Sequence, residues 1–144
     1  MKANKLASNI EKSNLNIIVS GYGCCRSEIL ATRGSLYDIQ RFGINFVNLA
    51  EDADILVLLG FSSESGINNA INIYKRMRSP KWVFACGSCA ISGGRFCGVP
   101  QMMGKLKRYI KVDMYIPGCP PRPEAFIYAV LKFISENNNS PVKV

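Results

Sequence analysis

Short apolar runs alternate with helical patterns along most of this chain, and that alternation restricts the possible fold more than any other feature. Strands are expected at residues 15–20, 44–49, 54–59, 81–85 and 113–116, where the runs are short and apolar or alternate. Helices are expected at 28–40, 66–77 and 123–135, where apolar residues recur at helical spacing, and at 100–109, which begins with proline. The segment 87–98 is rich in glycine, serine and cysteine and is expected to be a loop.

Strands that alternate with helices form βαβ units, and such units assemble into a mostly parallel sheet. The nearly all-apolar run 54–59 agrees, because strands of this kind are covered on both faces. The sequence therefore predicts an α/β fold, a three-layer α/β/α sandwich with a mostly parallel, flavodoxin-like sheet. A length of 144 residues suits one domain. We expect it to span 15–136, after an N-terminal extension (1–14) and before a flexible tail (137–144).

Hydropathy indicates no membrane-spanning segment. The longest apolar run, 55–61, has seven residues, whereas a spanning helix needs ~20. The N-terminus also lacks the apolar stretch of a secretory signal. The sequence therefore predicts a protein of the reducing cytoplasm.

The net charge is +8, and the basic residues gather in two clusters. One cluster is Lys75, Arg76, Arg78 and Lys81, and the other is Lys105, Lys107, Arg108 and Lys111. Such clusters are either solvated helix ends or a docking surface for an acidic subunit or an anionic membrane face. No aromatic stacking platform accompanies them, which disfavours nucleic acid as a partner.

The chain has six cysteines and no histidine. In a cytoplasmic chain, six cysteines favour metal binding or redox chemistry over disulfides. The lack of histidine excludes a Ser-His-Asp or Cys-His mechanism, a His-ligated zinc and a histidine proton shuttle. Chemistry at this chain must therefore come from cysteines, carboxylates or a bound cofactor.

The cysteines follow the ends of the expected strands. Cys24 and Cys25 come just after the first strand, Cys86, Cys89 and Cys97 at or after the end of the fourth, and Cys119 after the fifth. In a parallel sheet these positions share the carboxyl edge, where open α/β sheets bind their ligands. Three separate loops are thus expected to deliver thiols to one place.

Several converging thiols can hold a 4Fe–4S cluster or a structural zinc, each with four cysteine ligands. Zinc sites favour paired CxxC turns, but here only Cys86 and Cys89 have that spacing, and Cys24 and Cys25 are adjacent. Flanking glycines would let the backbone approach a bulky cluster. The pattern favours iron–sulfur, with zinc and buried or redox-sensing thiols as the alternatives.

Four segments in order, at 21–28, 37–43, 81–94 and 117–124, carry a resemblance to a known family. The chain resembles the small iron–sulfur (20 kDa, B-type) subunit of respiratory complex I over residues 15–135. The same superfamily includes the small subunits of membrane-bound, energy-converting (group 4) nickel–iron hydrogenases. Two segments depart from the family pattern, Arg26-Ser27 in place of apolar residues and 60–65 in place of a threonine-containing loop.

The resemblance implies a ligand set. The family's cysteines fall on Cys24, Cys25, Cys89 and Cys119, which would hold the terminal 4Fe–4S cluster. Cys86 and Cys97 match no ligand position, and we interpret them as small apolar core or loop residues. A second cluster or a pair of redox-sensitive thiols is the alternative for these two.

The resemblance also implies a function, that of an oxidoreductase subunit not catalytic alone. It would relay single electrons to a cavity shared with a large catalytic subunit, where quinone or a related acceptor is reduced and ion translocation is coupled. Further partners would be other iron–sulfur subunits and integral membrane subunits, with the chain peripheral on the cytoplasmic face of the cell membrane. The tandem cysteine pair favours the quinone-reductase branch. The alternatives are an energy-converting hydrogenase and, in another class, a non-catalytic zinc-stabilised binding domain.

Five other residues are candidates for a role. Glu28 is either a favourable charge in the first turn of a helix or, by resemblance, a possible proton relay at the catalytic cavity. Arg41 either pairs on the surface or contacts the partner subunit. Arg122 either raises the cluster potential or forms a structural or interface ion pair. Glu124 is expected in the first turn of a helix, and Trp82, like the tyrosines, in the core.

Overall fold

The computed structural model describes residues 14–60, 63–94 and 109–138. Its sheet has five parallel strands in the order β2-β1-β3-β4-β5. They are β1 (Leu15–Ser20), β2 (Ile44–Phe46), β3 (Ile55–Leu59), β4 (Trp82–Cys86) and β5 (Met114–Ile116). This order is the flavodoxin-like one, so the predicted fold class is confirmed.

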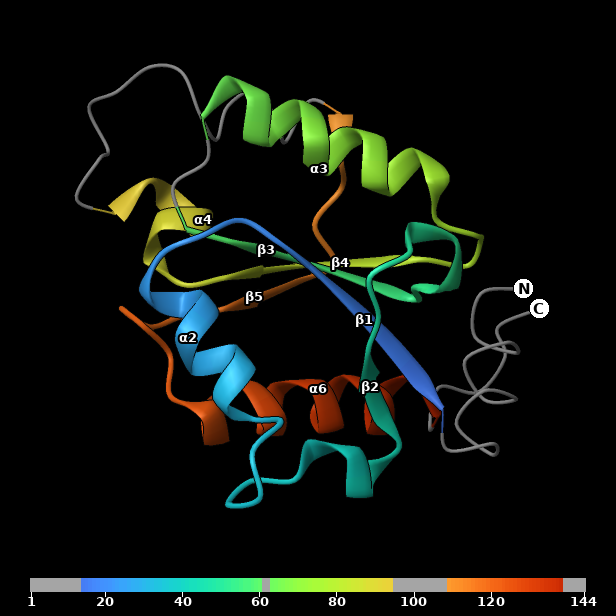
Figure 1. Ribbon diagram of the computed structural model, residues 1–144, viewed down its shortest axis with the longest axis vertical. Helices are drawn as coiled ribbons and strands as arrows, with labels where there is room; N and C mark the ends of the chain where they lie inside the picture. Colours follow the sequence, from blue (N-terminus) through green and yellow to red (C-terminus); the bar gives the residue numbers. More distant parts are fainter. Residues whose placement is uncertain (1–13, 61–62, 95–108, 139–144) are drawn as a thin grey trace.

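Helices cover both faces of the sheet, as Figure 1 shows. One face carries α2 (Cys24–Ala31), the 3-10 turn η1 (Ile39–Phe42) and α6 (Pro123–Asn138). The opposite face carries α3 (Glu64–Arg76) and the 3-10 turn η2 (Ala50–Asp52). The short helix α4 (Ser88–Ser92) follows β4 at the carboxyl end of the sheet.

The central strand β3 explains why the sheet is covered on both sides. Ile55, Val57 and Leu59 pack into the apolar cluster beneath α2 and α6. The alternate residues Leu56 and Leu58 pack into the cluster beneath α3. All five are buried, so a continuous apolar run is the pattern that this position requires.

The helix predicted over 28–40 is wrong at both ends. Helix α2 begins four residues earlier, at Cys24, because Gly23 at its N-cap has φ 97° and turns the chain directly from β1 into the helix. It ends at Ala31. The buried Thr32 donates its hydroxyl to the Ile29 carbonyl at 2.6 Å, and the Gly34 amide bonds to the Ala31 carbonyl in a tight turn.

Other boundaries differ less. The first part of the segment 87–98, predicted as a loop, forms α4. The strand predicted over 44–49 is shorter and ends at Phe46, and α6 continues to Asn138. The helix predicted over 100–109 and most of the second basic cluster lie outside the described residues. Among the helices that are described, none is long and apolar enough to cross a membrane.

Candidate metal centre

Three loops carry cysteines to the carboxyl edge of the sheet. Cys24 and Cys25 open α2 directly after the turn from β1. Cys89 lies in α4, just beyond β4, and Cys119 lies three residues beyond the end of β5. The edge predicted from the strand pattern is therefore the edge at which these four cysteines lie.

The loops that carry the cysteines meet at Gly87. Its φ is +87°, and a Cβ added there would lie 2.4 Å from the Cys25 Sγ and 3.7 Å from the Gly118 carbonyl oxygen. Gly94 makes a similar approach to Cys89, because its added Cβ would lie 3.2 Å from that Sγ. Backbone without side chains thus cradles two of the thiols, and a larger residue at Gly87 would displace Cys25.

Hydrogen bonds hold two of the loops together. The Gly87 amide donates to the Ile116 carbonyl at 2.8 Å, which continues the pairing of β4 with β5. The Ser88 amide donates to the Gly118 carbonyl at 2.8 Å, and the Ser88 hydroxyl donates to the same oxygen at 3.1 Å. These bonds fix the position of Cys89 relative to Cys119.

The four thiols also interact electrostatically. The pKa of Cys25 is raised to about 11, first by burial and then by the neighbouring Cys24, with Cys89 and Cys119 adding smaller contributions. Cys25 is buried, Cys89 is half-buried, and Cys24 and Cys119 are exposed. The site thus has one candidate ligand in the core and two at its rim.

The donor set and the cradle fit a 4Fe–4S cluster. Within the described part of the chain, no group of three or more His, Cys, Asp and Glu side chains is arranged to hold a metal ion. A zinc ion would need four ligands at about 2–2.3 Å from one point, whereas a four-iron cluster is held by four separate cysteines. Cys24, Cys25, Cys89 and Cys119 come from three loops and supply the four thiols that such a cluster needs.

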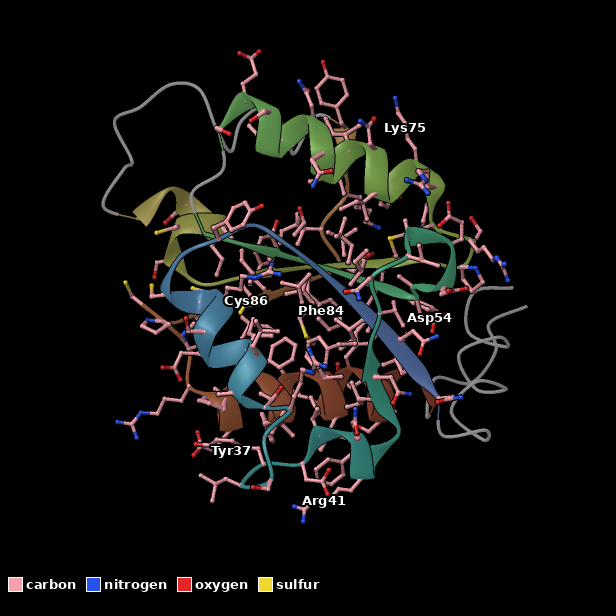
Figure 2. The ribbon with its side chains drawn as sticks, viewed as in Figure 1. Tyr37, Arg41, Asp54, Lys75, Phe84 and Cys86 are labelled. Atoms are coloured by element: carbon pink, nitrogen blue, oxygen red, sulfur yellow. The ribbon has the colours of Figure 1, made fainter. Side chains whose placement is uncertain are left out.

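Cys86 lies in the core beneath this edge. It is the last residue of β4, is 0% exposed and packs in the same apolar cluster as Cys25; Figure 2 labels it close to α2. Burial, and to a lesser extent the nearby Cys25, raises the pKa of its thiol to about 12. Its interpretation as a small core residue is confirmed, while Cys97 lies outside the described residues.

A group of polar side chains lines an open pocket on the surface beside Pro120. The pocket has a volume of about 410 Å³ and is lined by Glu28, Tyr37, Arg122 and Glu124. The Tyr37 hydroxyl donates to the Glu124 carboxylate at 3.2 Å. Partial desolvation, that hydrogen bond and the nearby carboxylates of Glu124 and Glu28 raise the pKa of Tyr37, while Arg122 opposes them. The structure therefore gathers three residues that the sequence offered separately.

Tyr37 is the member of this group that the sequence pattern did not single out. The signal was available, because Tyr37 opens the segment 37–43 that carries part of the resemblance. Glu28 is not in the first turn of a helix, since α2 starts at Cys24 and has no acidic residue in its first turn. The helix-start explanation of Glu28 is therefore wrong. Glu124 does lie in the first turn of α6, as predicted.

The remaining candidates divide between surface and core. Arg41 is exposed, and its guanidinium lies 4.8 Å from the centre of the Phe42 ring. Neither Arg41 nor Arg122 pairs with a carboxylate among the described residues. Trp82 packs in the core edge-to-face on Phe133, with ring centroids 6.0 Å apart. The prediction of core tyrosines is wrong for the exposed Tyr22, Tyr109, Tyr115 and Tyr128.

A comparison with protein families decides the relationship. Residues 23–133, which include all four candidate ligands, match the model of the NADH ubiquinone oxidoreductase 20 kDa subunit. The chain belongs to this family. The resemblance drawn from the four sequence segments is thereby confirmed.

Individual relatives agree with the family match. The chain is 38% identical over 141 residues to the B subunit of NADH-quinone oxidoreductase from Mycolicibacterium paratuberculosis, covering 97% of this chain and 76% of the relative. The corresponding protein of Mycobacterium tuberculosis is 37% identical over the same coverage. Most of the length of these relatives is therefore represented here.

Two solved structures are similar in fold. The membrane-bound sulfane sulfur reductase, an archaeal respiratory membrane complex, contains a chain with a TM-score of 0.84 and 29% identity, covering 97% of this chain and 78% of that one. An NAD⁺-reducing [NiFe]-hydrogenase contains one with a TM-score of 0.61 and 18% identity, covering 90% and 96%. The second likeness concerns the fold alone.

Proposed function

We propose that this chain is the electron-transfer subunit of a complex I-like oxidoreductase and holds one 4Fe–4S cluster on Cys24, Cys25, Cys89 and Cys119. The observation that carries the proposal is the meeting of three loops at Gly87, where an added Cβ would lie 2.4 Å from the Cys25 Sγ and 3.7 Å from the Gly118 carbonyl oxygen. Membership of the 20 kDa-subunit family, whose members bind a 4Fe–4S cluster, supports the assignment. A cluster held there supplies one-electron redox chemistry.

The chain's own residues have distinct tasks in this proposal. Cys25 anchors the group from the core side, and its burial keeps water from one side of the site. Cys24 and Cys119, at the rim, hold it from the exposed side. Gly87 and Gly94 keep the backbone close to the ligand sulfurs, where amide groups stabilise negative charge.

The exposed rim requires a partner. Two ligand cysteines exposed at one edge would leave the group open to water, so we propose that a large catalytic subunit covers this edge. Other iron–sulfur subunits and integral membrane subunits would complete a complex on the cytoplasmic face of the membrane. Electrons would pass across the covered edge to quinone or a related acceptor, with ion translocation coupled to the reaction.

Glu28 is proposed as a proton relay between this chain and the large subunit. It lines the space beside Pro120 together with Tyr37, Arg122 and Glu124. Arg122 offers a positive charge there without a carboxylate partner among the described residues. A carboxylate and a phenol around one cavity can hold and exchange a proton close to Cys119.

The identity of the electron acceptor separates a quinone reductase from the related alternative functions. The likeness to the sulfane sulfur reductase chain suits an acceptor other than quinone on the same module. A small subunit of an energy-converting nickel–iron hydrogenase is the alternative from the same superfamily. In each case the electron relay in this chain is the same, and the partner subunit carries the acceptor site.

The test is purification of the intact complex through an affinity tag on this chain. We expect about four irons and four sulfides attributable to this chain, and an EPR signal from the reduced complex that depends on Cys119. Nickel in the complex with hydrogen-dependent dye reduction would identify the hydrogenase alternative. A stable monomer that holds zinc and no iron would contradict the electron-transfer function.

A further inference from the structure

The sheet has an open edge beyond the end of β2. Strand β1 runs from Leu15 to Ser20, but its pairing with β2 ends at Ile17 and Phe46. The chain then leaves the sheet and enters η2, on the face that carries α3. Among the described residues, the last part of β1 therefore has a neighbouring strand, β3, on one side only.

Val19 directs its backbone groups to this open side. In a parallel sheet, alternate residues of a strand bond to opposite neighbours. The Leu15 amide donates to the Gly43 carbonyl at 2.8 Å. The Ile17 carbonyl accepts a hydrogen bond from the Val47 amide at 2.9 Å, so Leu15 and Ile17 face β2. Val19 is next in this series, and no backbone hydrogen bond of the described residues joins it to the chain beyond β2. Its amide and carbonyl are thus placed to pair with a further strand.

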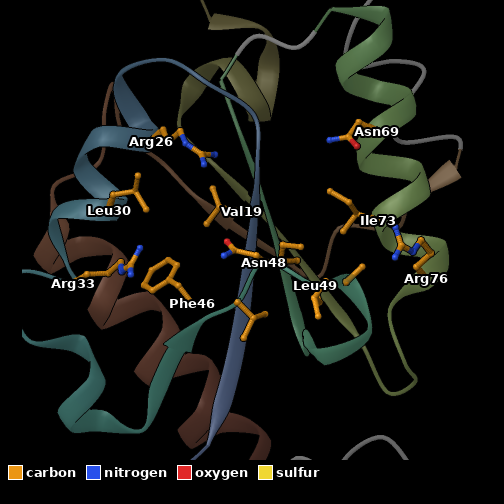
Figure 3. A pocket seen from close by; sticks show the side chains of 13 residues that line it. Val19, Arg26, Leu30, Arg33, Phe46, Asn48, Leu49, Asn69, Ile73 and Arg76 are labelled. Atoms are coloured by element: carbon orange, nitrogen blue, oxygen red, sulfur yellow. The ribbon is translucent and has the colours of Figure 1, made fainter.

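An open groove of about 430 Å³, which we call the α2–α3 groove, lies at this edge between the two helices. Figure 3 shows Val19 on β1 between α2 and α3. Apolar side chains from both helices and from the end of β2 and the loop after it line the groove: Leu30, Phe46, Leu49 and Ile73. Leu49 is 59% exposed there. Apolar side chains beside an unpaired strand edge are the features that bind an extended polypeptide.

Arginine supplies the charge of the α2–α3 groove. Arg26 and Arg33 point into it from α2 in Figure 3, and neither forms an ion pair among the described residues. Their guanidinium groups lie 5.7 and 5.8 Å from the centres of aromatic rings. Arg76 lines the groove from α3 but pairs with Glu51 at 2.6 Å. No carboxylate lines the groove within the described part of the chain, so two positive charges there lack a counter-charge.

The rest of this chain does not match the charge of the α2–α3 groove. The segments 1–13, 95–108 and 139–144, which lie outside the described residues, each contain more lysine and arginine than aspartate and glutamate. A second copy of the chain would bring a net charge of +8. Charge complementarity therefore favours an acidic segment of a different chain.

We propose that the α2–α3 groove binds an extended acidic segment of a partner subunit, which adds to the sheet as a strand beside Val19. The backbone of the segment bonds to the amide and carbonyl of Val19, its carboxylates pair with Arg26 and Arg33, and its apolar side chains contact Leu49. In this mode of recognition the main-chain bonds give affinity and the side chains give specificity. The segment belongs to the oxidoreductase complex of the proposed function, so the contact rests on that function. It does not depend on the cluster, because no described cysteine lines the groove.

A photo-cross-linker in the intact complex identifies the segment. Leu49→p-benzoylphenylalanine, irradiated and analysed by mass spectrometry, should cross-link to an Asp- or Glu-containing segment of another subunit. Combining Arg26→Gln with Arg33→Gln should lower the yield by at least about fivefold, because two charge-assisted contacts are lost. Arg41→Gln is the matched control. Arg41 lies on η1 over an aromatic ring and does not line the groove, so the yield should change by less than about twofold.

Hydrogen exchange at single amides tests the added strand itself. In the wild-type complex the Val19 amide should be protected, and in the double variant it should exchange roughly fivefold faster because its hydrogen bond is lost. The Ser20 amide, on the alternate side that faces β3, should stay protected in both. Where the double variant does not assemble, Arg33→Gln alone is measured, and the same directions of change are expected.

Three results would overturn the proposal. The first is no cross-link from position 49, or a cross-link only to lipid, to this chain or to a segment without carboxylates. The second is an equal yield in the double variant and in Arg41→Gln, and the third is rapid exchange at Val19 in the wild-type complex. Iron content is measured in the same samples and should stay constant in all of them. Failure of the groove is therefore distinguishable from failure of the electron-transfer function, which would appear as an assembled wild-type complex without iron on this chain.

Discussion

Cys86 and Cys89 are separated by two residues, yet the structure places them in different regions. Cys86 ends β4, is fully buried and packs among apolar side chains. Cys89 lies in α4, half-buried, beside the cradle made by Gly94. The change from strand to helix at Gly87 separates the core from the edge. Two cysteines at CxxC spacing therefore lie in different surroundings here, because a strand ends between them.

Ligand substitution gives the largest expected difference between edge and core. Cys119→Ser or Cys89→Ser should reduce the iron bound by this chain from about four atoms to nearly none, because each removes one of the four proposed ligands. Cys86→Ala should keep all of the iron, since it removes only a buried core side chain. Iron analysis and low-temperature EPR of the reduced complex measure both.

Two outcomes would contradict the assignment of the cluster to the cysteines at the edge of the sheet. A full cluster signal in Cys119→Ser, or its loss in a folded Cys86→Ala complex, would move the ligand set into the core. Cys97→Ser serves as a further control, because the resemblance gives that cysteine no ligand role and it should retain the signal.

The second-largest expected effect concerns Glu28, the proposed proton relay in the pocket beside Pro120. Glu28→Gln keeps the shape of the side chain and removes its titratable proton, and positioned acid–base groups contribute ~10²–10⁴-fold to rate. We expect turnover of the complex to fall at least tenfold, with normal assembly and a normal EPR signal. Wild-type turnover in a correctly assembled variant would reduce Glu28 to a polar lining residue.

Glu124→Gln is the matched control for that change. Glu124 lines the same cavity and accepts a hydrogen bond from Tyr37, but it lies in the first turn of α6 rather than on α2. Loss of this carboxylate should cost stability through the helix start, by about 0.3–1 kcal/mol. Turnover should fall less than in Glu28→Gln, and an equal fall would assign the relay to the pair rather than to Glu28.

The sequence predicted the five strands, and the ends of these strands predicted that the cysteines gather at the carboxyl edge of the sheet. Each run contains a strand, and the continuous apolar run of β3 reflects burial on both faces of the sheet. Strand length was less predictable, since the strand expected over 44–49 ends at Phe46. The start of α2 was missed, since it is set by the positive φ of Gly23 and not by apolar periodicity. The short helix α4 was missed because glycine and serine dominate its segment.

The polar neighbourhood could not be predicted. Tyr37 and Glu124 are 87 residues apart, and their hydrogen bond depends on how the chain turns after α2 and where α6 docks. The path of the chain after α2 and the position of α6 cannot be predicted without knowing the strand order.

The third expected effect concerns Gly87, which separates the core residue Cys86 from Cys89 at the edge of the sheet. A Cβ there would lie 2.4 Å from the Cys25 Sγ, so Gly87→Ala should displace that ligand and lower iron content by more than half. Gly23→Ala is the matched control, because Gly23 has a similar φ of +97° but nothing within 4 Å of the added Cβ. Both glycines have a positive φ with an extended ψ (155° at Gly87 and −168° at Gly23), so alanine at either position carries a backbone strain of about 1–3 kcal/mol. The clash with the thiol is what separates the two variants. Equal iron contents would show that the cradle does not position Cys25.

The smallest expected effect is on stability and concerns Cys86 alone. Cys86→Ser places a hydroxyl among apolar side chains, and a buried polar group without a partner costs about 1–3 kcal/mol. Cys86→Ala leaves a small void instead and avoids that desolvation cost. We therefore expect thermal unfolding, followed by the loss of cluster absorbance, to occur at a lower temperature in the serine variant than in the alanine variant. Iron content below the transition should be the same in both. Serine replaces a cysteine ligand of a cluster only poorly. A Cys86→Ser variant that loses iron while its unfolding temperature is unchanged would therefore mean that Cys86 contacts the cluster. Cys86 would then belong to the metal centre at the edge of the sheet and not to the core.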